Sequence, residues 1–198
     1  MTAIEPLGRV FVIAGPSGVG KGTIVRGVLD RLPGLRRSVS ATTRPPRPNE
    51  RDGVDYLFVS DEEFSRMARE GELLEWAEVF GHRYGTPVRL VGEALERGED
   101  VLLEIDVQGA HQVRERMPSA VLILLEPPSM AELERRLRER ATEDEVGLSE
   151  RLATAEWELD QRAWFDHTVL NDDVERAVDL LVAIIQGFPT PTEGPTRP

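Results

Sequence analysis

The stretch Gly15-Pro16-Ser17-Gly18-Val19-Gly20-Lys21-Gly22-Thr23 decides the fold, because it combines a glycine-rich turn with a lysine at a fixed spacing. It matches the pattern G-x-x-x-x-G-K, in which successive backbone N–H groups surround a phosphate. Lys21 is the only lysine among 24 Lys and Arg residues. A compact ammonium group fits along phosphate oxygens where the planar guanidinium fits poorly. The stretch therefore predicts a loop that binds the phosphates of a nucleoside triphosphate.

The segments on either side of this loop have the periodicity that such a loop requires. The apolar run at 10–14 is typical of a buried parallel strand. After Lys21, apolar residues recur at helical spacing up to Leu32. A glycine-rich turn without a ligand is the alternative, but strand, loop and helix in this order favour phosphate binding. Gly22 stands where Ser or Thr is usual, so coordination of a metal by the hydroxyl of Thr23 is left open.

Composition restricts the class of protein. A length of 198 residues suits one α/β domain, and a net charge of −12 argues against a nucleic-acid backbone as the main partner. The absence of cysteine excludes disulfides and thiolate ligands. No apolar stretch approaches the ~20 residues of a membrane span, and the first residues lack the pattern of a signal peptide. We therefore expect a soluble cytoplasmic protein that binds neither nucleic acid nor membrane.

Short apolar runs alternate with helical patterns, which predicts a parallel sheet with covering helices. We expect strands at 10–14, 101–105, 120–125 and 168–170. We expect helices at 21–32, 61–70, 87–97, 109–117, 129–140, 149–163 and 173–187, two of which begin with the capping patterns at Ser60 and Ser129. Between 35 and 86 the pattern changes to short strands around Val39, 56–59 and 73–76, which indicates an inserted subdomain for a second ligand.

Two arginines and three carboxylates are candidates for that second ligand. Arg44 and Arg47 lie in a proline-rich loop and could bind phosphate oxygens, although a solvated basic loop explains them equally well. Glu75 and Glu104 lie among apolar residues, and a guanine edge would supply the donors that buried carboxylates need. A salt bridge at a strand edge or a solvent-facing position are the alternatives. Asp106 ends an apolar strand, where acidic residues commonly hold Mg²⁺ through water.

Three further arginines flank a polar segment at 141–148 that has the composition of a mobile lid. Arg136 and Arg140 are four residues apart and share one helix face, and Arg151 follows the segment. The first two could pair with nearby glutamates at the surface, or the face could close over transferring phosphates. The spacing leaves both interpretations open.

Taken together, these pieces resemble the guanylate kinase family in its bacterial form. The matching segments are 15–23, 40–47, 53–60, 75–77, 84–86, 104–109, 136–151 and 171–173, spread over about residues 9–187. The resemblance implies an α/β fold of the P-loop kinase type, in which a five-stranded parallel sheet core with flanking helices carries an inserted GMP-binding subdomain and a mobile lid. One domain at 1–198 would comprise a core at 9–34, 88–136 and 152–188, a GMP-binding subdomain at 35–87, a lid at 137–151 and a disordered tail at 189–198.

The resemblance also implies roles for the matching residues. ATP would bind to Gly15, Pro16, Ser17, Gly18, Val19, Gly20, Lys21, Gly22, Thr23 and Asn171. The GMP phosphate would bind to Arg44, Arg47, Tyr56 and Tyr84, and the guanine edge to Ser40, Glu75, Thr86 and Glu104, with Asp106 nearby. Phosphoryl transfer would depend on Lys21, Arg44, Arg136, Arg140 and Arg151. Mg²⁺ would be held mainly by ATP phosphates and water, with Thr23 and Asp106 as candidate contacts.

By this resemblance the chain would transfer the γ-phosphoryl group of ATP to GMP, and to dGMP, in purine nucleotide metabolism and GMP recycling. It would act as a monomer or a homodimer. One alternative is a catalytically weak guanylate-kinase-like module that binds phosphorylated partners, and the complete phosphate loop argues against it. Another is a related P-loop kinase of a phosphorylated sugar, and the segment 40–47 argues against that.

Overall fold

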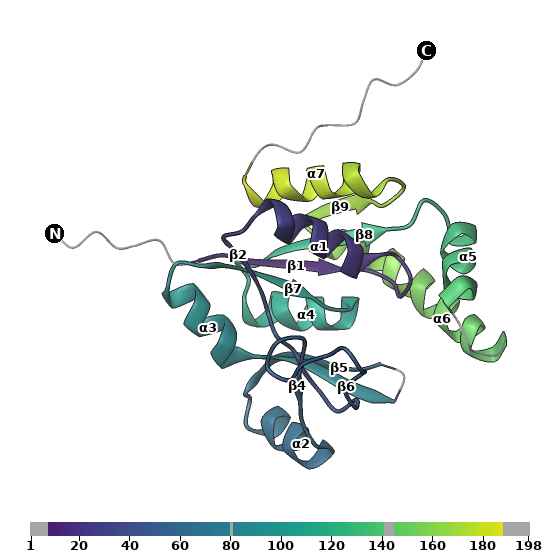
Figure 1. Ribbon diagram of the computed structural model, residues 1–198. Coiled ribbons are helices and arrows are strands. Elements are labelled where there is room, and N and C mark those ends of the chain that lie inside the picture. The colour runs from purple at the N-terminus through teal and green to yellow at the C-terminus, as the bar shows by residue number, and fades with distance from the viewer. Residues whose placement is uncertain (1–7, 80, 141–144, 188–198) are drawn as a thin grey trace.

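A computed structural model describes residues 8–79, 81–140 and 145–187 of the chain (Figure 1). Its core is a five-stranded sheet with the order β2-β7-β1-β8-β9, in which every neighbouring pair is parallel. The strands are β1 (Val10–Ala14), β2 (Leu35–Arg37), β7 (Asp100–Glu104), β8 (Val121–Glu126) and β9 (His167–Leu170). The predicted five-stranded parallel core is therefore confirmed.

Helices cover both faces of this sheet (Figure 1). They are α1 (Lys21–Arg31) and α7 (Val174–Ile185) on one face, and α3 (Val88–Glu96) and α4 (Val107–Arg116) on the other. Side chains of a strand alternate between faces, so in β1 Phe11 and Ile13 pack toward α1 and α7 while Val12 packs toward α3 and α4. An apolar run without polar interruptions is what a strand buried on both faces requires.

A second, four-stranded sheet has the order β4-β3-β6-β5. Its elements are β3 (Ala41–Thr42), β4 (Leu57–Phe58), α2 (Asp61–Arg69), β5 (Leu73–Val79) and β6 (His82–Pro87). Phe64 and Met67 of α2 pack on Leu73 and Ala41 in a small core of its own. Because β2 belongs to the large sheet, this unit begins after residue 37 and not at the predicted 35; the rest of the predicted division of the chain stays a prediction.

Two helices extend beyond the large sheet. They are α5 (Met130–Arg140) and α6 (Glu145–Asp160), with a 3₁₀ turn η1 (Gln161–Trp164) after α6. Leu133 and Leu137 of α5 pack against Leu148 and Ala155 of α6. The predicted lid at 137–151 lies partly outside the described residues, because 141–144 are not described, and the predicted tail at 189–198 lies wholly outside them.

Helix caps decide where several elements begin. The hydroxyl of Ser60 accepts the Glu63 N–H at 3.1 Å, and that of Ser129 accepts the Glu132 N–H at 3.1 Å, so both predicted starts hold. Asp106 caps α4 by accepting the Gly109 N–H at 2.7 Å. This cap starts α4 at Val107, two residues before the predicted start, because the carboxylate satisfies an otherwise unpaired amide.

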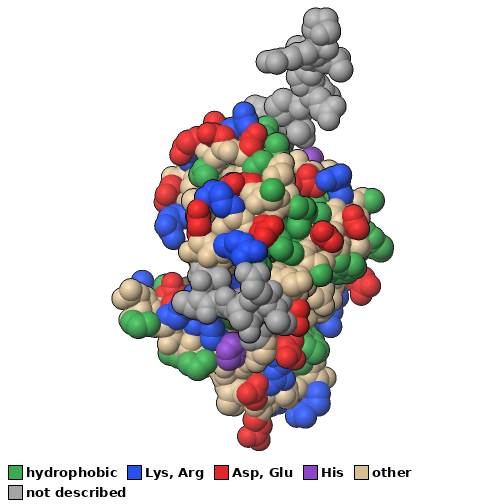
Figure 2. Space-filling model, turned by 90° about the vertical axis from the view of Figure 1, so that its right-hand side faces the viewer, with side chains coloured by type: hydrophobic (Ala, Val, Ile, Leu, Met, Phe, Trp, Pro, Cys, Tyr) green, Lys and Arg blue, Asp and Glu red, His purple; other side chains and the backbone are tan. Residues whose placement is uncertain are grey.

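On the face shown in Figure 2, acidic and basic side chains lie interspersed. Surface ion pairs of the protein include Arg66 with Glu63 and Glu72. Exposed pairs contribute only about 0–1 kcal/mol each, so the apolar clusters and not these pairs hold the fold. In the described part of the chain, no helix combines the length and the apolar character that crossing a membrane needs.

Gly20 is a position where only glycine fits. It caps the start of α1 with a φ of 102°, and a Cβ there would lie 2.7 Å from the side-chain nitrogen of Asn171. We expect Gly20→Ala to lower the free energy of unfolding by about 2 kcal/mol or more, because left-handed strain adds to the steric conflict. Chemical denaturation measures this change. Gly34→Ala is the control, since a Cβ there meets nothing within 4 Å, and equal stabilities of the two variants would contradict the expectation.

Candidate functional site

A cavity of about 460 Å³ lies where the carboxyl ends of β1, β2 and β7 meet the small sheet and α6. Ligands of parallel α/β folds bind at this edge of the sheet. The predicted site residues that line it are Gly15, Ser17, Lys21, Ser40, Tyr56, Glu75, Tyr84, Glu104 and Asp106. The cavity thus joins the phosphate loop at one end to the small sheet at the other.

Lys21 opens α1 and is half-buried. Its ammonium group donates to the backbone carbonyl of Gly15 and, at 3.2 Å, to that of Pro16. These contacts fold the side chain back over the loop, beside the amides at the helix N-terminus that favour an anion. The ammonium group and the backbone amides are thus preorganised for binding phosphate oxygens in this loop.

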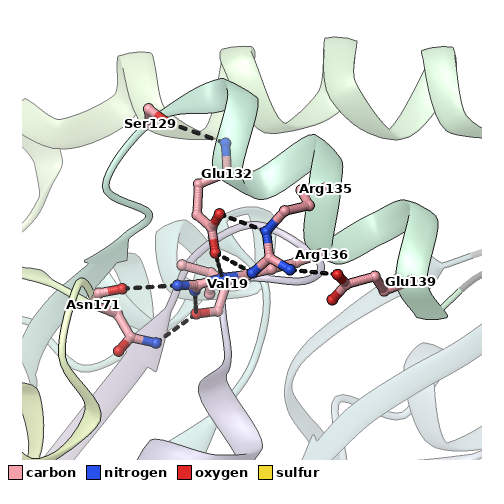
Figure 3. Close-up of polar contacts among 7 residues, drawn as sticks. All are labelled: Val19, Ser129, Glu132, Arg135, Arg136, Glu139 and Asn171. Atoms are coloured by element: carbon pink, nitrogen blue, oxygen red, sulfur yellow. Dashed lines mark hydrogen bonds and ion pairs between the residues drawn. The ribbon is translucent and has the colours of Figure 1, made fainter.

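Asn171 and Arg136 hold the outer side of this loop (Figure 3). The Asn171 side chain is 3% exposed and donates to the carbonyl of Val19 at 2.7 Å. Arg136 donates to the same carbonyl at 3.3 Å and is oriented by Glu132 at 2.8 Å. The resemblance placed Asn171 near adenine and Arg136 over phosphates; in this structure both brace the phosphate loop from behind.

Glu75 is a buried carboxylate at the far end of the cavity. It is 4% exposed and accepts the hydroxyl of Thr86 at 2.6 Å, which leaves its second oxygen available. That oxygen lies 2.5 Å from the place where a Cβ of Gly109 would stand, and Oδ1 of Asp106 lies 3.3 Å from the same place. Glu75 and Asp106 therefore meet at the start of α4, a close approach that requires glycine at 109.

The environment of Glu75 disfavours its charge. The pKa of Glu75 is raised to about 7. Burial is the main cause and the negative charge of Asp106 adds to it, while the hydrogen bond from Thr86 acts in the opposite direction. Among the described residues no Lys or Arg forms an ion pair with it, so the predicted alternative of a strand-edge salt bridge does not apply. A ligand that donates hydrogen bonds to the second oxygen would favour the charged form of this carboxyl group.

Glu104 faces a different part of the cavity. One of its oxygens pairs with Arg37 at 3.1 Å, and the other lies 3.5 Å from the place where a Cβ of Gly22 would stand in the phosphate loop. Glu104 is thus close to the phosphate loop, whereas Asp106 is close to Glu75. The resemblance assigned Glu104 to the guanine edge and gave Asp106 as a candidate contact of Mg²⁺. The geometry favours the opposite assignment.

Arg44 and Arg47 differ in their surroundings. Arg44 donates to both oxygens of Glu50, at 2.8 and 2.9 Å, and its guanidinium lies 5.5 Å from the centre of the Tyr56 ring. The hydrogen bond to Glu50 is the main reason that the pKa of Arg44 is raised, and a bond to Tyr84 adds to it. Arg47 is exposed, and its backbone amide bonds Glu50 at 2.8 Å. A solvated basic loop therefore describes Arg47 in this state but not Arg44.

Several other predicted site residues are not among those that line the cavity. Thr86 is fully buried and acts on the cavity through Glu75, and Thr23 is exposed on α1. Arg140 ends α5, where its side chain lies outside what the structure describes, and Arg151 lies half-buried on α6. The structure thus places Ser40, Glu75 and Glu104 in the lining of one cavity, with Thr86 bonded to Glu75, and leaves the arrangement of the lid arginines as a prediction.

Sequence reasoning missed Glu158, which lines the cavity from α6 and is 6% exposed. It accepts the backbone N–H of Val107, and burial raises its pKa while the charge of Lys21 lowers it. A signal was present in the sequence: Glu158 stands three residues after the buried Ala155, on the apolar face of its helix.

Arg37 was missed as well, because its partner Glu104 is distant in the sequence. Glu50 was missed although its partners Arg44 and Arg47 are near in the sequence, since no periodic pattern marks contacts within an irregular loop.

Comparisons with known proteins agree on one family. The family model described as guanylate kinase matches residues 7–187. A guanylate kinase of Rubrobacter xylanophilus is 52% identical over 179 residues, covering 90% of this chain and 94% of that protein. One from Synechococcus sp. is 49% identical over 187 residues, covering 94% and 86%.

Solved structures agree with this result. The crystal structure of guanylate kinase from Anaplasma phagocytophilum has a TM-score of 0.75 at 35% identity, with 92% of this chain and 86% of that chain covered. A gluconokinase from Sinorhizobium meliloti has a TM-score of 0.50 at 18% identity, with 92% and 93% covered. The second likeness concerns the fold alone.

The raised pKa of Glu75 predicts a pH-dependent stability. The unfolded chain loses this proton near pH 4.5 and the folded protein near pH 7, so the folded state becomes less stable as the pH rises between these values. We expect Glu75→Gln to remove this loss and to be more stable than the wild type by about 3 kcal/mol at pH 8. Denaturant unfolding at pH 5 and pH 8 measures it. Glu78→Gln, an exposed position of the same strand, is the control, and parallel pH profiles of wild type and Glu75→Gln would contradict the assignment.

Proposed function

We propose that this chain, which belongs to the guanylate kinase family, transfers the γ-phosphoryl group of ATP to GMP and releases ADP and GDP. One observation carries the proposal. A single cavity has a lysine-bearing phosphate loop at one end and two neighbouring carboxylates, the buried Glu75 and the half-buried Asp106, at the other. The first suits a triphosphate and the second suits the N1–H and N2–H₂ donors of guanine.

Recognition of guanine is assigned to Glu75 and Asp106, with Ser40 at the rim of the same cavity. Thr86 fixes one oxygen of Glu75 and leaves the other for the base. Asp106 is fixed in turn by the Gly109 amide. Adenine offers neither N1–H nor N2–H₂ and would leave both carboxylates unpaired, so selection against AMP should be about 10⁴-fold or more.

The acceptor phosphate is assigned to Arg44, Arg47, Tyr56 and Tyr84. Arg44 is already oriented by Glu50 and lies against Tyr56, so little side-chain entropy is lost when phosphate binds. Arg47, exposed in the same loop, would have to turn inward. Closure of this loop and of the lid would bring Arg136, Arg140 and Arg151 toward the reacting phosphates and exclude water.

Mg²⁺ is proposed to bind mainly through ATP phosphates and water. Among the described residues no group of three or more Asp, Glu or His side chains could hold a metal ion by itself, which fits an ion that keeps its water and uses the substrate as ligand. Glu104, beside Gly22, is the carboxylate best placed to hold such water, with Thr23 and Asp106 farther candidates. When bound, the ion would neutralise charge on the β- and γ-phosphates.

The transfer itself needs little covalent help from the protein. An oxygen of the GMP phosphate attacks the γ-phosphorus of ATP, the bond from that phosphorus to the bridging oxygen breaks, and ADP leaves with the bonding electrons. Because the attacking oxygen is already anionic, no side chain has to act as a base. Lys21 and the arginines contribute by holding the two phosphates in line and by balancing their charge.

Several finer points are part of this proposal. We include dGMP as an acceptor, and the monomer or homodimer as the working form. We place the reaction in the cytoplasm, where ATP and GMP occur, and assign it to purine nucleotide metabolism and GMP recycling. The binding-module and sugar-kinase alternatives gain no support, since the phosphate loop is intact and the acceptor end of the cavity carries guanine-type acceptors.

An acceptor assay tests the proposed reaction. We expect ADP release from Mg-ATP with GMP, and at least about 10⁴-fold less with AMP, CMP or UMP. Lys21→Met should lower kcat by about 10³-fold or more with an unchanged fold, because the loop loses its charge on the phosphates. Arg26→Gln, an exposed change on the same helix, should leave turnover unchanged. Turnover with another acceptor, or normal turnover by Lys21→Met, would reject the proposal.

A second experiment separates the roles of Glu104, which ends β7, and Asp106, which follows it. Asp106→Asn should raise the KM for GMP by about 10- to 100-fold with little change in the KM for ATP, because it removes a charged acceptor for guanine. Asparagine can still accept the Gly109 amide, so the helix cap survives. Glu104→Gln should instead lower kcat and raise the Mg²⁺ concentration needed. A larger effect of Glu104→Gln on the KM for GMP would restore the role that the resemblance implied.

A further inference from the structure

The cavity has an unusual balance of charge for a site that receives phosphates. Its described lining carries carboxylates at Asp55, Glu75, Glu78, Glu104, Asp106 and Glu158. The cations in the same lining are Lys21 and Arg37. Lys21 is folded back on the phosphate loop, where it serves the donor nucleotide. On the acceptor side of the cavity, Arg37 is therefore the cation of this lining that a dianionic phosphate would meet.

Arg37 stands at the end of β2, directly before the segment that carries Ser40. Its guanidinium reaches across to β7 and pairs with Glu104 at 3.1 Å, with 44% of the side chain exposed. The preceding residue behaves differently: Arg36 pairs with Glu99 at 3.2 Å, is 58% exposed and is not among the lining residues. Adjacent positions of a strand face opposite sides, so the two arginines differ in position but not in chemistry.

The charge of Arg37 acts on residues of both the donor side and the acceptor side of the cavity. Burial raises the pKa of Tyr56, the charge of Glu104 raises it further, and the charge of Arg37 lowers it. Both charges therefore act on the Tyr56 hydroxyl, which belongs to the acceptor-phosphate group. Glu104 itself lies beside Gly22 of the phosphate loop. Arg37 is thus linked to the donor side through its ion pair with Glu104 and to the acceptor side through the effect of its charge on Tyr56.

We propose that Arg37 is a further substrate-binding residue, whose guanidinium binds the phosphate of the acceptor nucleotide and which Glu104 holds in place while the site is empty. This rests on the proposed function. The Arg37–Glu104 ion pair is partly exposed to solvent and therefore contributes little to stability, so exchanging Glu104 for phosphate costs little. An arginine–phosphate contact is charge-assisted and can be bidentate, which makes it the stronger of the two. The exchange also frees Glu104 to face the donor phosphates and their water.

The test compares matched variants of adjacent arginines. Arg37→Gln should raise the KM for GMP about tenfold and leave the KM for ATP within about twofold, and Arg36→Gln should change neither. The inhibition constant of guanosine, a probe with the same base and no phosphate, should be the same in wild type and Arg37→Gln. Arg37→Lys, which keeps the charge, should recover part of the GMP affinity. Thermal unfolding of each variant checks that the fold is retained.

The possible results separate this inference from the proposed function. No turnover of GMP by the wild type would reject the function itself. Normal wild-type turnover with an unchanged KM for GMP in Arg37→Gln would reject only the role of Arg37. An equal loss for GMP and guanosine would mean that Arg37 merely supports the cavity, and a rise in the KM for ATP would assign it to the donor. If Arg37→Gln unfolds, the KM for GMP of Arg37→Lys decides the question. Lysine keeps the charge but lacks the planar fork that binds phosphate with two hydrogen bonds, so a normal KM for GMP in this variant would count against the proposal.

Discussion

The parallel pairing of β1 with β7 is the constraint on which the site depends. In this register Ile13 lies beside Glu104, so the phosphate loop that follows β1 and the carboxylates that end and follow β7 emerge at the same edge of the sheet. A slip by one residue would turn the side chains of β7 to the opposite face. The register is in turn fixed by burial, because alternate residues of β1 fill two separate apolar clusters. The geometry of the cavity here follows from the packing of β1, a strand none of whose residues lines that cavity.

The small sheet supplies what the large sheet cannot. A phosphate loop recognises phosphates but not bases, so selection of the acceptor needs a second surface opposite the strand ends. Glu75 and Thr86 pair across β5 and β6 and present one fixed carboxylate oxygen to the cavity. Gln112 of α4 ties the backbone of Trp76 to the large sheet, at 2.7 and 3.1 Å. The surface proposed to recognise the base is therefore joined by hydrogen bonds, as well as by the chain, to a helix that covers the large sheet.

The sequence predicted much of the core because its signals are local. The apolar run of β1, the spacing in α1 and the capping serines each act within a few residues, and the structure has them where they were expected. Signals that depend on distant partners could not be found. The strand β6 has no alternating pattern and exists because it pairs with β5 and β3. The different neighbours of Glu104 and Asp106 arise from the positions of Gly22 and Gly109, which no pattern in 104–106 encodes. Arg37 and Glu158 were missed for the same reason, because their partners, Glu104 and the Val107 amide, come from other elements.

Lys21 determines how the side chains of this protein respond to reagents that modify amines. In a chain with one lysine and many arginines, an amine-directed reagent has a single side-chain target, and that target stands in the phosphate loop. Its nitrogen is engaged with two backbone carbonyls and half-buried, so its reactivity reports the state of the loop and not an average over the surface. Acylation there would remove the charge that the phosphates require and would add bulk where the nucleotide lies. The proposed binding group would thus also be a selective point of covalent inactivation and a reporter of occupancy of the loop.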